Sequence, residues 1–515
     1  MQVSPSKVTL MLLAWKRLGD NLDLEKLLTS RWLRIALWFI VAALSAAKFL
    51  YLSADFPNWS LWMIDQAKFT DEGWWASAAV AHALTAHWYV AGDYNPAVAL
   101  PVWPALLGVV FHFTGVSVIA ARAFNVAISI ATLGVVFVLV RRYTATKSET
   151  PALLAVLLLA ASPFAFVFNR LAILETLVVF EFCLLLLVAS FASAKRFWPL
   201  AALSVLTTAM LLTKTTSALL VPAVVWVAWS AMDLKPAGLW RSILAVAVLP
   251  FALVKGYAAL VAALGYGADY QYFFGVNAMP DIDWHQTIAT LSGLFQNCIW
   301  VDRVLYPVSL LILLLAVAWK RKLWGNSLFT ASWIAVAAQA AFIFMRQEDF
   351  APRYFLVMLA PIIWIVTLTF GELTSDTKKT AILLLVLMAA SAGSNVVTIR
   401  QFLTDRDYDF RDAALSIRAI VRSHPQQRPL ILGASGAQVS LMTGIPSIDD
   451  GYGTEDIAKK VARLQPGWYL AWNDLNLENE PFLSPFRLEK MASYAAFDDD
   501  TRTTLTLYKL VPREY

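Results

Sequence analysis

The sequence TDEGWW at residues 70–75 places two adjacent carboxylates, Asp71 and Glu72, in a loop that follows the first long apolar run of the chain. Aromatic and proline residues crowd the same loop. A carboxylate beside a bilayer is costly to desolvate and easy to leave out of a sequence, so its presence there indicates a function. We therefore interpret Asp71 and Glu72 as the chemical centre, and the apolar helices as the frame that holds this centre at a membrane surface.

The composition is that of a protein that crosses a membrane many times. The 515 residues are 59% hydrophobic and only 15% charged, with a mean hydropathy of +0.61, whereas soluble domains are about 25% charged. Apolar runs of roughly 18 or more residues recur along most of the chain, which is the signal of membrane helices. The net charge of +5 comes from small basic clusters between these runs. Such clusters carry topology information and do not indicate a nucleic-acid partner.

Segments near the first span are expected to lie along the membrane surface. Residues 7–28 carry apolar and basic side chains on opposite helix faces, which predicts a cytoplasmic amphipathic helix within residues 1–30; a disordered basic tail is the alternative. No cleavable signal peptide is evident. In the outer loop, residues 54–117, the apolar segments 73–90 and 101–114 are too short to span, so we expect interfacial helices with their tryptophans, Trp103 among them, at headgroup depth.

The basic residues decide the topology. In a competing interpretation residues 101–117 form a full span, which inverts everything that follows. If they lie flat instead, every later basic cluster falls on the side of the basic N-terminus, as the positive-inside rule requires. We therefore predict about eleven spans, with the N-terminus cytoplasmic and the C-terminus outside. They are expected at residues 32–53, 118–140, 151–168, 173–193, 198–213, 215–232, 242–264, 303–319, 327–345, 354–371 and 380–397.

After this membrane module, residues 31–397, the composition becomes charged and free of predicted spans. Helical and strand patterns alternate over residues 398–515, which predicts a small extracytoplasmic α/β domain. The turn Gly433–Gly436 does not complete a dinucleotide fingerprint, so we interpret it as a strand-to-helix turn. Helices are expected at residues 412–422, 437–443 and 454–464, and strands at 429–433, 468–472 and 503–511.

Under this topology, ionisable residues from distant segments share the outer membrane face. Carboxylates can act as a general base, and arginine or lysine can hold a phosphate. A reaction on a phosphorylated lipid at the bilayer surface needs both kinds. The residues are Asp65, Lys68, Asp71, Glu72, Asp93, Arg122, Arg170, Glu175, Lys214, Arg303, Arg346, Glu348, Asp349 and Arg353.

Several short motifs follow one another over roughly residues 30–400. In order they are Thr70-Asp71-Glu72, Asn95-Pro96, Pro101-Val102-Trp103-Pro104, Arg122, Arg141-Arg142, Ser162-Pro163, Asn169-Arg170 through Glu175, Leu212-Thr213-Lys214, and Arg353-Tyr354. This order resembles the GT-C superfamily of membrane glycosyltransferases, especially bacterial relatives of the lipid A aminoarabinose transferase and the protein O-mannosyltransferases. The resemblance implies a multi-pass protein of the bacterial inner membrane, with juxtamembrane helices in the first outer loop and a periplasm-facing active site.

The resemblance also implies an activity and roles for the acids. Asp71 matches the first-loop acid of the family, which acts as general base while a hexose or pentose moves with inversion from a polyprenyl-phosphate donor to a lipid, glycan or protein acceptor. Glu72 would position substrate, or else be a solvated loop acid. Glu175 stands where the family has its second outer acid, usually an aspartate; its alternative role is a structural partner of Arg170.

The cations are assigned to the donor phosphate. A lysine such as Lys214, inside an apolar stretch, is expensive unless its ammonium reaches an interface or an anion. By the resemblance it would contact the donor phosphate or the neighbouring carboxylate; snorkelling is the alternative. Arg353 with Tyr354 is the leading phosphate-binding candidate, and Arg170 and Arg346 are weaker ones. Close relatives often carry a lysine or histidine before a Pro-Pro pair, where this chain has Asn95-Pro96-Ala97-Val98, so the donor headgroup is expected to be seated differently. Arg122 is expected to be an interface anchor.

A metal is not required by these motifs. His82 and His87 are close to Asp71 in sequence and could ligate a divalent metal, but a spacing of five does not align two rings on one helix face, and interfacial histidines are the alternative. Two other function classes remain open from the residues alone. A lipid or glycan transporter or flippase would favour internal repeats and charges near the midplane. A non-catalytic scaffold whose outer domain binds a partner would not need Asp71, Glu175, Lys214 and Arg353 to converge.

Overall fold

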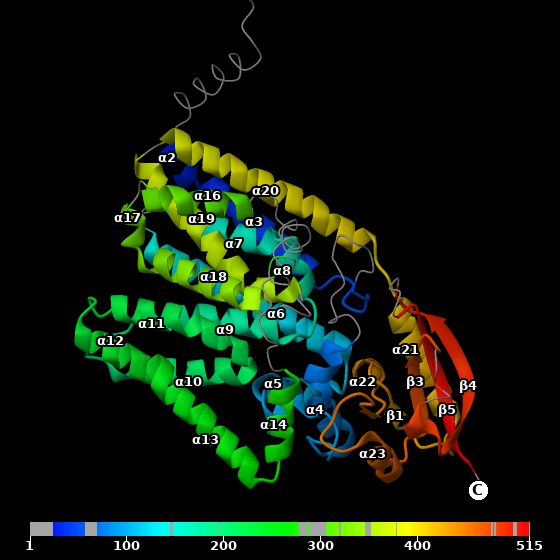
Figure 1. Cartoon of the computed structure of the whole chain (residues 1–515). Helices are drawn as coiled ribbons and strands as arrows, with labels where there is room; N and C mark the ends of the chain where they lie inside the picture. The colour runs from blue at the N-terminus through cyan, green and yellow to red at the C-terminus, as the bar shows by residue number, and fades with distance from the viewer. Residues whose placement is uncertain are drawn as a thin grey trace, which may run out of the picture.

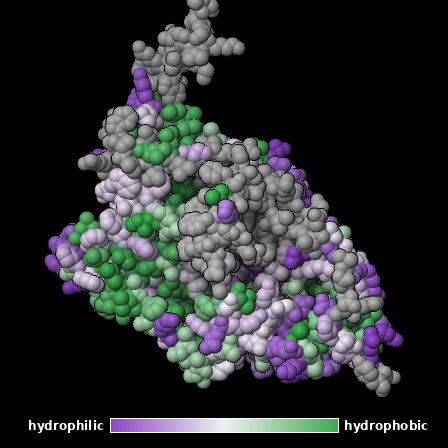
Figure 2. Space-filling view, viewed as in Figure 1, coloured by the Kyte–Doolittle hydropathy of each residue, from purple (hydrophilic) through white to green (hydrophobic). Residues whose placement is uncertain are grey.

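The computed structural model describes residues 24–56, 70–144, 148–193, 195–277, 285, 288, 305–318, 321–345, 352–376, 378–474, 477, 480–497 and 502–513. A helical bundle occupies the centre and left of Figure 1, and residues 409–513, here called the C-terminal domain, lie at the right beside helix α4 (Asp71–Thr85). On the face seen in Figure 2, hydrophobic residues gather over the bundle and hydrophilic ones over the C-terminal domain.

Each of the eleven predicted spans coincides with a helix. Within the described residues four helices are long and apolar enough to cross a membrane, and they begin at Val118, Pro236, Arg353 and Lys378. Several others are apolar but shorter, so the span count stays a prediction. The helices are α3 (Arg31–Ala47), α6 (Val118–Tyr143), α7 (Thr150–Ala161), α9 (Leu174–Ala189), α10 (Phe197–Thr213), α11 (Val221–Ser230), α12 (Pro236–Ile243) with α13 (Leu249–Ala263), α16 (Leu305–Ala318), α18 (Ser327–Met345), α19 (Leu356–Asp376) and α20 (Lys378–Thr404).

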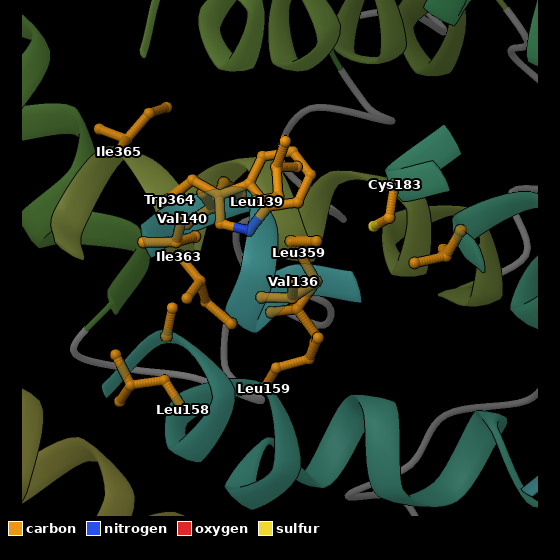
Figure 3. Close-up of a cluster of buried hydrophobic side chains, with 14 of the residues drawn as sticks. Val136, Leu139, Val140, Leu158, Leu159, Cys183, Leu359, Ile363, Trp364 and Ile365 are labelled. Atoms are coloured by element: carbon orange, nitrogen blue, oxygen red, sulfur yellow. The ribbon is translucent and has the colours of Figure 1, made fainter. Parts of the chain in front are cut away.

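Helix α19 is the axis of the bundle, because most of its apolar length is buried inside the protein. Figure 3 shows Leu359, Ile363 and Trp364 of this helix among side chains of α6, α7 and α9, such as Leu139 and Cys183. Lipid tails are as apolar as leucine, so close packing and not exclusion from water holds such helices together. The short 3₁₀ turn η8 (Pro352–Phe355) leads into α19, and its Phe355 belongs to the same buried cluster.

Two predicted spans are interrupted near one end. The span predicted at 151–168 divides into α7 and α8 (Pro163–Phe168), because Ser162 accepts a hydrogen bond from the Ala165 amide and Pro163 starts the new helix. The span predicted at 215–232 begins with the 3₁₀ turn η4 (Thr215–Leu220) before α11, and Lys214 joins this turn to the end of α10 at Thr213. These breaks place polar residues at helix ends.

The outer loop contains the two predicted short helices, α4 and α5 (Val102–Thr114), joined through the 3₁₀ turn η3 (Pro96–Val98). Their place at the membrane surface stays a prediction. Trp103 is fully buried and its ring stacks on Phe124 with centroids 5.9 Å apart, so its side chain does not face lipid headgroups. Of the predicted N-terminal helix only α2 (Leu24–Thr29) falls within the described residues.

The C-terminal domain is built on a five-stranded sheet of order β2-β1-β3-β5-β4. Strand β1 (Ile431–Leu432) pairs in parallel with β2 (Ser447–Ile448) and β3 (Trp468–Trp472). Strand β5 (Thr504–Pro512) pairs antiparallel with β3 and with β4 (Phe486–Ala495). The helices are α21 (Asp409–Ser423), α22 (Gly436–Thr443) and α23 (Ile457–Leu464). The predicted helices and strands are all present, whereas β2 and β4 were not predicted.

The turn after β1 is a strand-to-helix turn, as predicted. Gly433 has a φ of 151°, and its oxygen accepts a hydrogen bond from the Gly436 amide at 2.9 Å. A Cβ atom on Gly433 would lie 2.7 Å from the backbone oxygen of Leu470 in β3. Only glycine suits this conformation and this close approach. The turn directs α22 from the sheet toward α4 (Figure 1).

Candidate active site

Four charged side chains from four separate segments meet at one end of the bundle. Arg353 Nη2 lies 2.5 Å from Asp71 Oδ2, and Arg353 Nε lies 3.5 Å from Glu175 Oε1. Lys214 forms an ion pair with the same Glu175. None of these side chains is more than 14% exposed. The result is a buried chain of alternating charges in the order Asp71, Arg353, Glu175 and Lys214. Its formal net charge is zero.

Each of these residues stands where a helix begins or ends. Asp71 is the first residue of α4, and Glu175 lies in the first turn of α9. A helix N-terminus favours a nearby negative charge, so both carboxylates are placed favourably. Lys214 and Arg353 occupy the break after α10 and the turn before α19. The breaks in the helices therefore gather the charged groups.

Tyr354 lies between the two cations. Its ring centroid is 4.3 Å from Lys214 Nζ and 5.3 Å from the guanidinium carbon of Arg353. A cation near an aromatic face is stabilised by about 0.5–2 kcal/mol, more when it is desolvated. A cavity of about 10 Å³ adjoins the site, lined by Glu175, Lys214 and Gln339 among others, which is room for about one water molecule. Tyr354 thus contacts both cations, and of these two cations Lys214 borders the small cavity.

Glu72, the residue after Asp71, belongs to a second buried cluster with its own partners. Its carboxylate accepts hydrogen bonds from Arg122 Nε at 2.8 Å and Nη2 at 2.5 Å, and from the Ala172 amide at 2.8 Å. Gln438 Nε2 of the C-terminal domain is the fourth donor, at 3.2 Å. Glu72 is fully buried, so the alternative of a solvated loop acid is wrong. Arg122 is also buried and bound to this carboxylate, so it is not the interface anchor that we expected.

The comparison with known proteins gives the fold. The structure of ArnT from Cupriavidus metallidurans bound to undecaprenyl phosphate matches with a TM-score of 0.57 at 14% identity, over 92% of this chain and 97% of that one. The chain has the fold of the GT-C membrane glycosyltransferases.

Two further comparisons agree with the GT-C fold. The oligosaccharyltransferase AglB from Archaeoglobus fulgidus, in complex with an inhibitory peptide and a dolichol-phosphate, matches with a TM-score of 0.50 at 10% identity, over 86% of this chain and 70% of that one. Residues 96–257 match the family described as dolichyl-phosphate-mannose-protein mannosyltransferase. No curated protein matches the chain. The family match covers part of the chain, and the solved structures share its fold.

Other predicted site residues lie apart from the four charges. The Arg170 guanidinium donates to the Leu50 oxygen and lies 5.0 Å from the ring centroid of Phe402. Glu175 pairs with Lys214 and Arg353 and not with Arg170, so its alternative structural role is not the one seen. Arg346 falls outside the described residues, as do Asp65, Lys68, Arg303, Glu348 and Asp349.

The histidines show no sign of metal ligation within the described residues. His82 stacks on Trp88 with ring centroids 4.3 Å apart and planes 7° from parallel. In the part of the chain that the structure describes, no three histidine, cysteine, aspartate or glutamate residues are grouped so that they could hold a metal ion.

The C-terminal domain is joined to the first outer loop by buried polar contacts. Lys460 is buried and its Nζ lies 2.9 Å from Asp93 Oδ1. Trp74 Nε1 donates to Asp449 Oδ2 at 3.2 Å. Asp55 accepts hydrogen bonds from the amides of Phe410 and Arg411 and so caps α21. Sequence reasoning did not find these pairs or the contacts of Gln438, because their partners are hundreds of residues apart and carry no local signal.

The contact between the C-terminal domain and the first outer loop is expected to weaken as the pH rises. Burial raises the pKa of Asp55 to about 7 and that of Asp449 to about 7, and also raises the pKa of Asp450. Because the folded state holds these protons more tightly than the unfolded state, the free energy of unfolding falls as the pH rises through about 4 to 7. We expect the thermal unfolding midpoint of the purified protein to drop between about pH 4 and pH 7.

The isosteric substitution Asp55→Asn is the control for this effect. It keeps an acceptor for the α21 amides and removes the ionisable group, so the drop should become smaller. A midpoint that rises over this pH range, or an unchanged drop in Asp55→Asn, would contradict the assignment.

Proposed function

We propose that the chain is an inverting glycosyltransferase that moves a sugar from a polyprenyl-phosphate donor to a hydroxyl of a lipid, glycan or protein acceptor. The observation that supports this most is the buried charge chain, in which Arg353 holds Asp71 with one nitrogen and approaches Glu175 with another. One acid beside two cations is what transfer from a lipid phosphate requires. A scaffold would not need this convergence, and a transporter would place its charges near the midplane.

The donor phosphate is expected to take the place of Asp71 on Arg353. A guanidinium has five N–H donors in a fixed fork that matches a phosphate, and Lys214 adds a point charge beside it. The phosphate therefore binds to both cations and releases the Asp71 carboxylate. Binding of the donor would in this way free the base, and the resting ion pair would keep the base occupied while the donor is absent.

Asp71 then acts as the general base. It takes the proton of the acceptor hydroxyl while the acceptor oxygen attacks the anomeric carbon. The bond between that carbon and the phosphate oxygen breaks on the opposite face, and the electron pair leaves with the polyprenyl phosphate. Arg353 and Lys214 stabilise the departing charge, so no protein acid is needed. A single displacement with one base inverts the anomeric configuration.

Glu175 is proposed to position the two cations. It accepts from Lys214 and lies 3.5 Å from Arg353 Nε, so it holds both toward the place where the phosphate would sit. Its charge also prevents two buried cations from repelling each other when the donor is absent. Glu72 is proposed to position the start of α4 in a similar way, since its oxygens are engaged by Arg122, Ala172 and Gln438.

The location proposed is a bacterial inner membrane, with the site and the C-terminal domain on the extracytoplasmic side. The test compares extracted glycolipids, envelope polysaccharides and proteins from cells with and without the protein by mass spectrometry. We expect one product to lose one sugar and the polyprenyl-phosphate sugar to accumulate. Wild-type protein should restore the product and Asp71→Asn should not. Identical profiles in both cell types would contradict the proposal.

A further inference from the structure

The helix that carries Asp71 is in direct backbone contact with the C-terminal domain. A Cβ atom on Gly73 of α4 would lie 2.2 Å from the backbone nitrogen of Gln438 in α22. No side chain fits there, so glycine is what allows the two helices to meet. Figure 1 shows α22 of the C-terminal domain against α4 of the outer loop. The contact lies two residues from the proposed base.

Gln438 uses both ends of its amide at this contact. Its Oε1 accepts a hydrogen bond from the Gly73 amide at 2.7 Å, and its Nε2 donates to Glu72 Oε2 at 3.2 Å. The side chain is fully buried. Because a buried amide without hydrogen-bond partners is destabilising, this geometry is specified at both ends of the side chain. Glu72 in turn accepts hydrogen bonds from Arg122 and from the Ala172 amide, so Gln438 is connected through Glu72 to both residues.

The first turn of a helix needs acceptors from outside the helix. Its first amides have no partner within the helix, and the side chain at the N-cap position normally accepts from the second or third of them. In α4 the N-cap residue is Thr70, whose hydroxyl donates to Asp71 Oδ1 at 3.3 Å. Gly73 is the third residue of the helix, and the acceptor for its amide is Gln438 Oε1. The cap of this helix therefore comes from the C-terminal domain.

We propose that Gln438 is a positioning residue for the transfer reaction, which caps the helix of Asp71 from the C-terminal domain and so sets the orientation of the base. The proposal rests on the proposed role of Asp71. The C-terminal domain is then part of the active site and not an appended module. The contacts of Trp74 with Asp449 and of Asp93 with Lys460 hold the domain in the place that this cap requires.

The test variant is Gln438→Met, which keeps the length of the side chain and removes both polar ends. Its matched control is Gln427→Met. The side-chain amide of Gln427 also makes two hydrogen bonds, since its Nε2 donates to the oxygens of Gly467 and Leu510, but both partners lie within the C-terminal domain. Binding sites are counted in both variants by titration with undecaprenyl phosphate, and kcat is expressed per binding site. A loss of folded protein lowers the number of sites and leaves kcat per site unchanged.

We expect kcat per site to fall about tenfold to a hundredfold in Gln438→Met, because a misplaced base is costly even at about 1 Å. The Kd for undecaprenyl phosphate should not rise by more than about twofold, since Arg353 and Lys214 belong to the bundle and not to α4, and a loosened Asp71 competes less for Arg353. Gln427→Met should keep kcat per site within about twofold. A kcat per site in Gln438→Met equal to that of the control would overturn the proposal.

The variant Gln438→Glu gives a second signature. An ionised carboxyl still accepts from the Gly73 amide but repels Glu72, and only its protonated form can donate to Glu72 as the amide does. The charged groups bonded in this network are Glu72 of α4 and Arg122 of α6. The deficit in kcat relative to wild type should therefore shrink as the pH falls in Gln438→Glu, and stay constant in Gln438→Met. Equal pH dependence in the two variants would contradict the role of the donated hydrogen bond.

Hydrogen exchange tests the cap without any sugar transfer. The amides of residues 70–75 should exchange at least about tenfold faster in Gln438→Met than in wild type or Gln427→Met, since a lost cap frays the first turn. Unchanged exchange would overturn the proposal by itself. If the wild-type protein transfers no sugar while the exchange result holds, the proposed function fails and the cap stands.

Discussion

Asp71→Asn is expected to lower kcat by about 10²- to 10⁴-fold, the usual contribution of a general base, while the affinity for polyprenyl phosphate stays the same or increases. The carboxylate competes with the donor phosphate for Arg353, to which it is bound at 2.5 Å. Removing its charge leaves one excess positive charge in the buried chain, which an incoming anion would compensate. Loss of turnover together with undiminished donor binding is the specific signature of a base that the donor must displace.

Both quantities can be measured on the purified protein, with kcat from product formation and Kd from titration with undecaprenyl phosphate. The matched control is Asp412→Asn, which removes the charge of an exposed aspartate paired with Arg411 on the C-terminal domain. The control should leave both quantities within about twofold of wild type. Full activity in a folded Asp71→Asn protein would reject the base, and donor affinity lowered tenfold or more would reject the competition for Arg353.

Arg353→Ala is expected to have the largest effect on donor binding. Truncating one partner of a buried charge pair costs about 2–5 kcal/mol, so the Kd for undecaprenyl phosphate should rise about 30-fold or more. The KM for the acceptor should change much less. The substitution leaves Asp71 and Glu175 with only Lys214 to balance them, so the protein should also lose about 3–5 kcal/mol of stability.

Arg353→Lys separates these effects, because it keeps the charge and loses the fork of donors. It should restore most of the stability and only part of the donor affinity. Arg406→Ala is the matched control, since Arg406 is exposed and contacts the Tyr51 ring and the Leu403 oxygen, away from the site. If Arg353→Ala weakened acceptor binding more than donor binding, Arg353 would belong to the acceptor site.

The sequence predicted the elements whose pattern is local. Residues 468–472 were expected as a strand, and β3 (Trp468–Trp472) has these bounds, because five buried or nearly buried residues in a row are bounded by turn residues on both sides. The strand β4 was missed, since Arg487, Glu489 and Lys490 place charges along an exposed edge and hide its alternation. The span predicted at 151–168 was not divided, because Ser162 acts as a cap only when the chain actually turns there.

The site was predictable where topology alone brings residues together. Counting basic clusters placed Asp71, Glu175, Lys214 and Arg353 on one membrane face, and their ion pairs confirm that they meet. The topology could not say which acid binds which cation. It also missed that Glu72 faces Arg122 and Gln438, because a carboxylate adjacent to Asp71 points to another side of the helix and finds its partners 50 and 366 residues away.

The central claim is that Asp71 and the donor phosphate bind Arg353 in turn. A structure of the protein with undecaprenyl phosphate tests this most directly. The account predicts that phosphate oxygens lie within about 3 Å of both Arg353 and Lys214, and that the Asp71 carboxylate has left Arg353 and faces the space where an acceptor hydroxyl would enter. A phosphate bound elsewhere, with Asp71 still paired to Arg353, would contradict it.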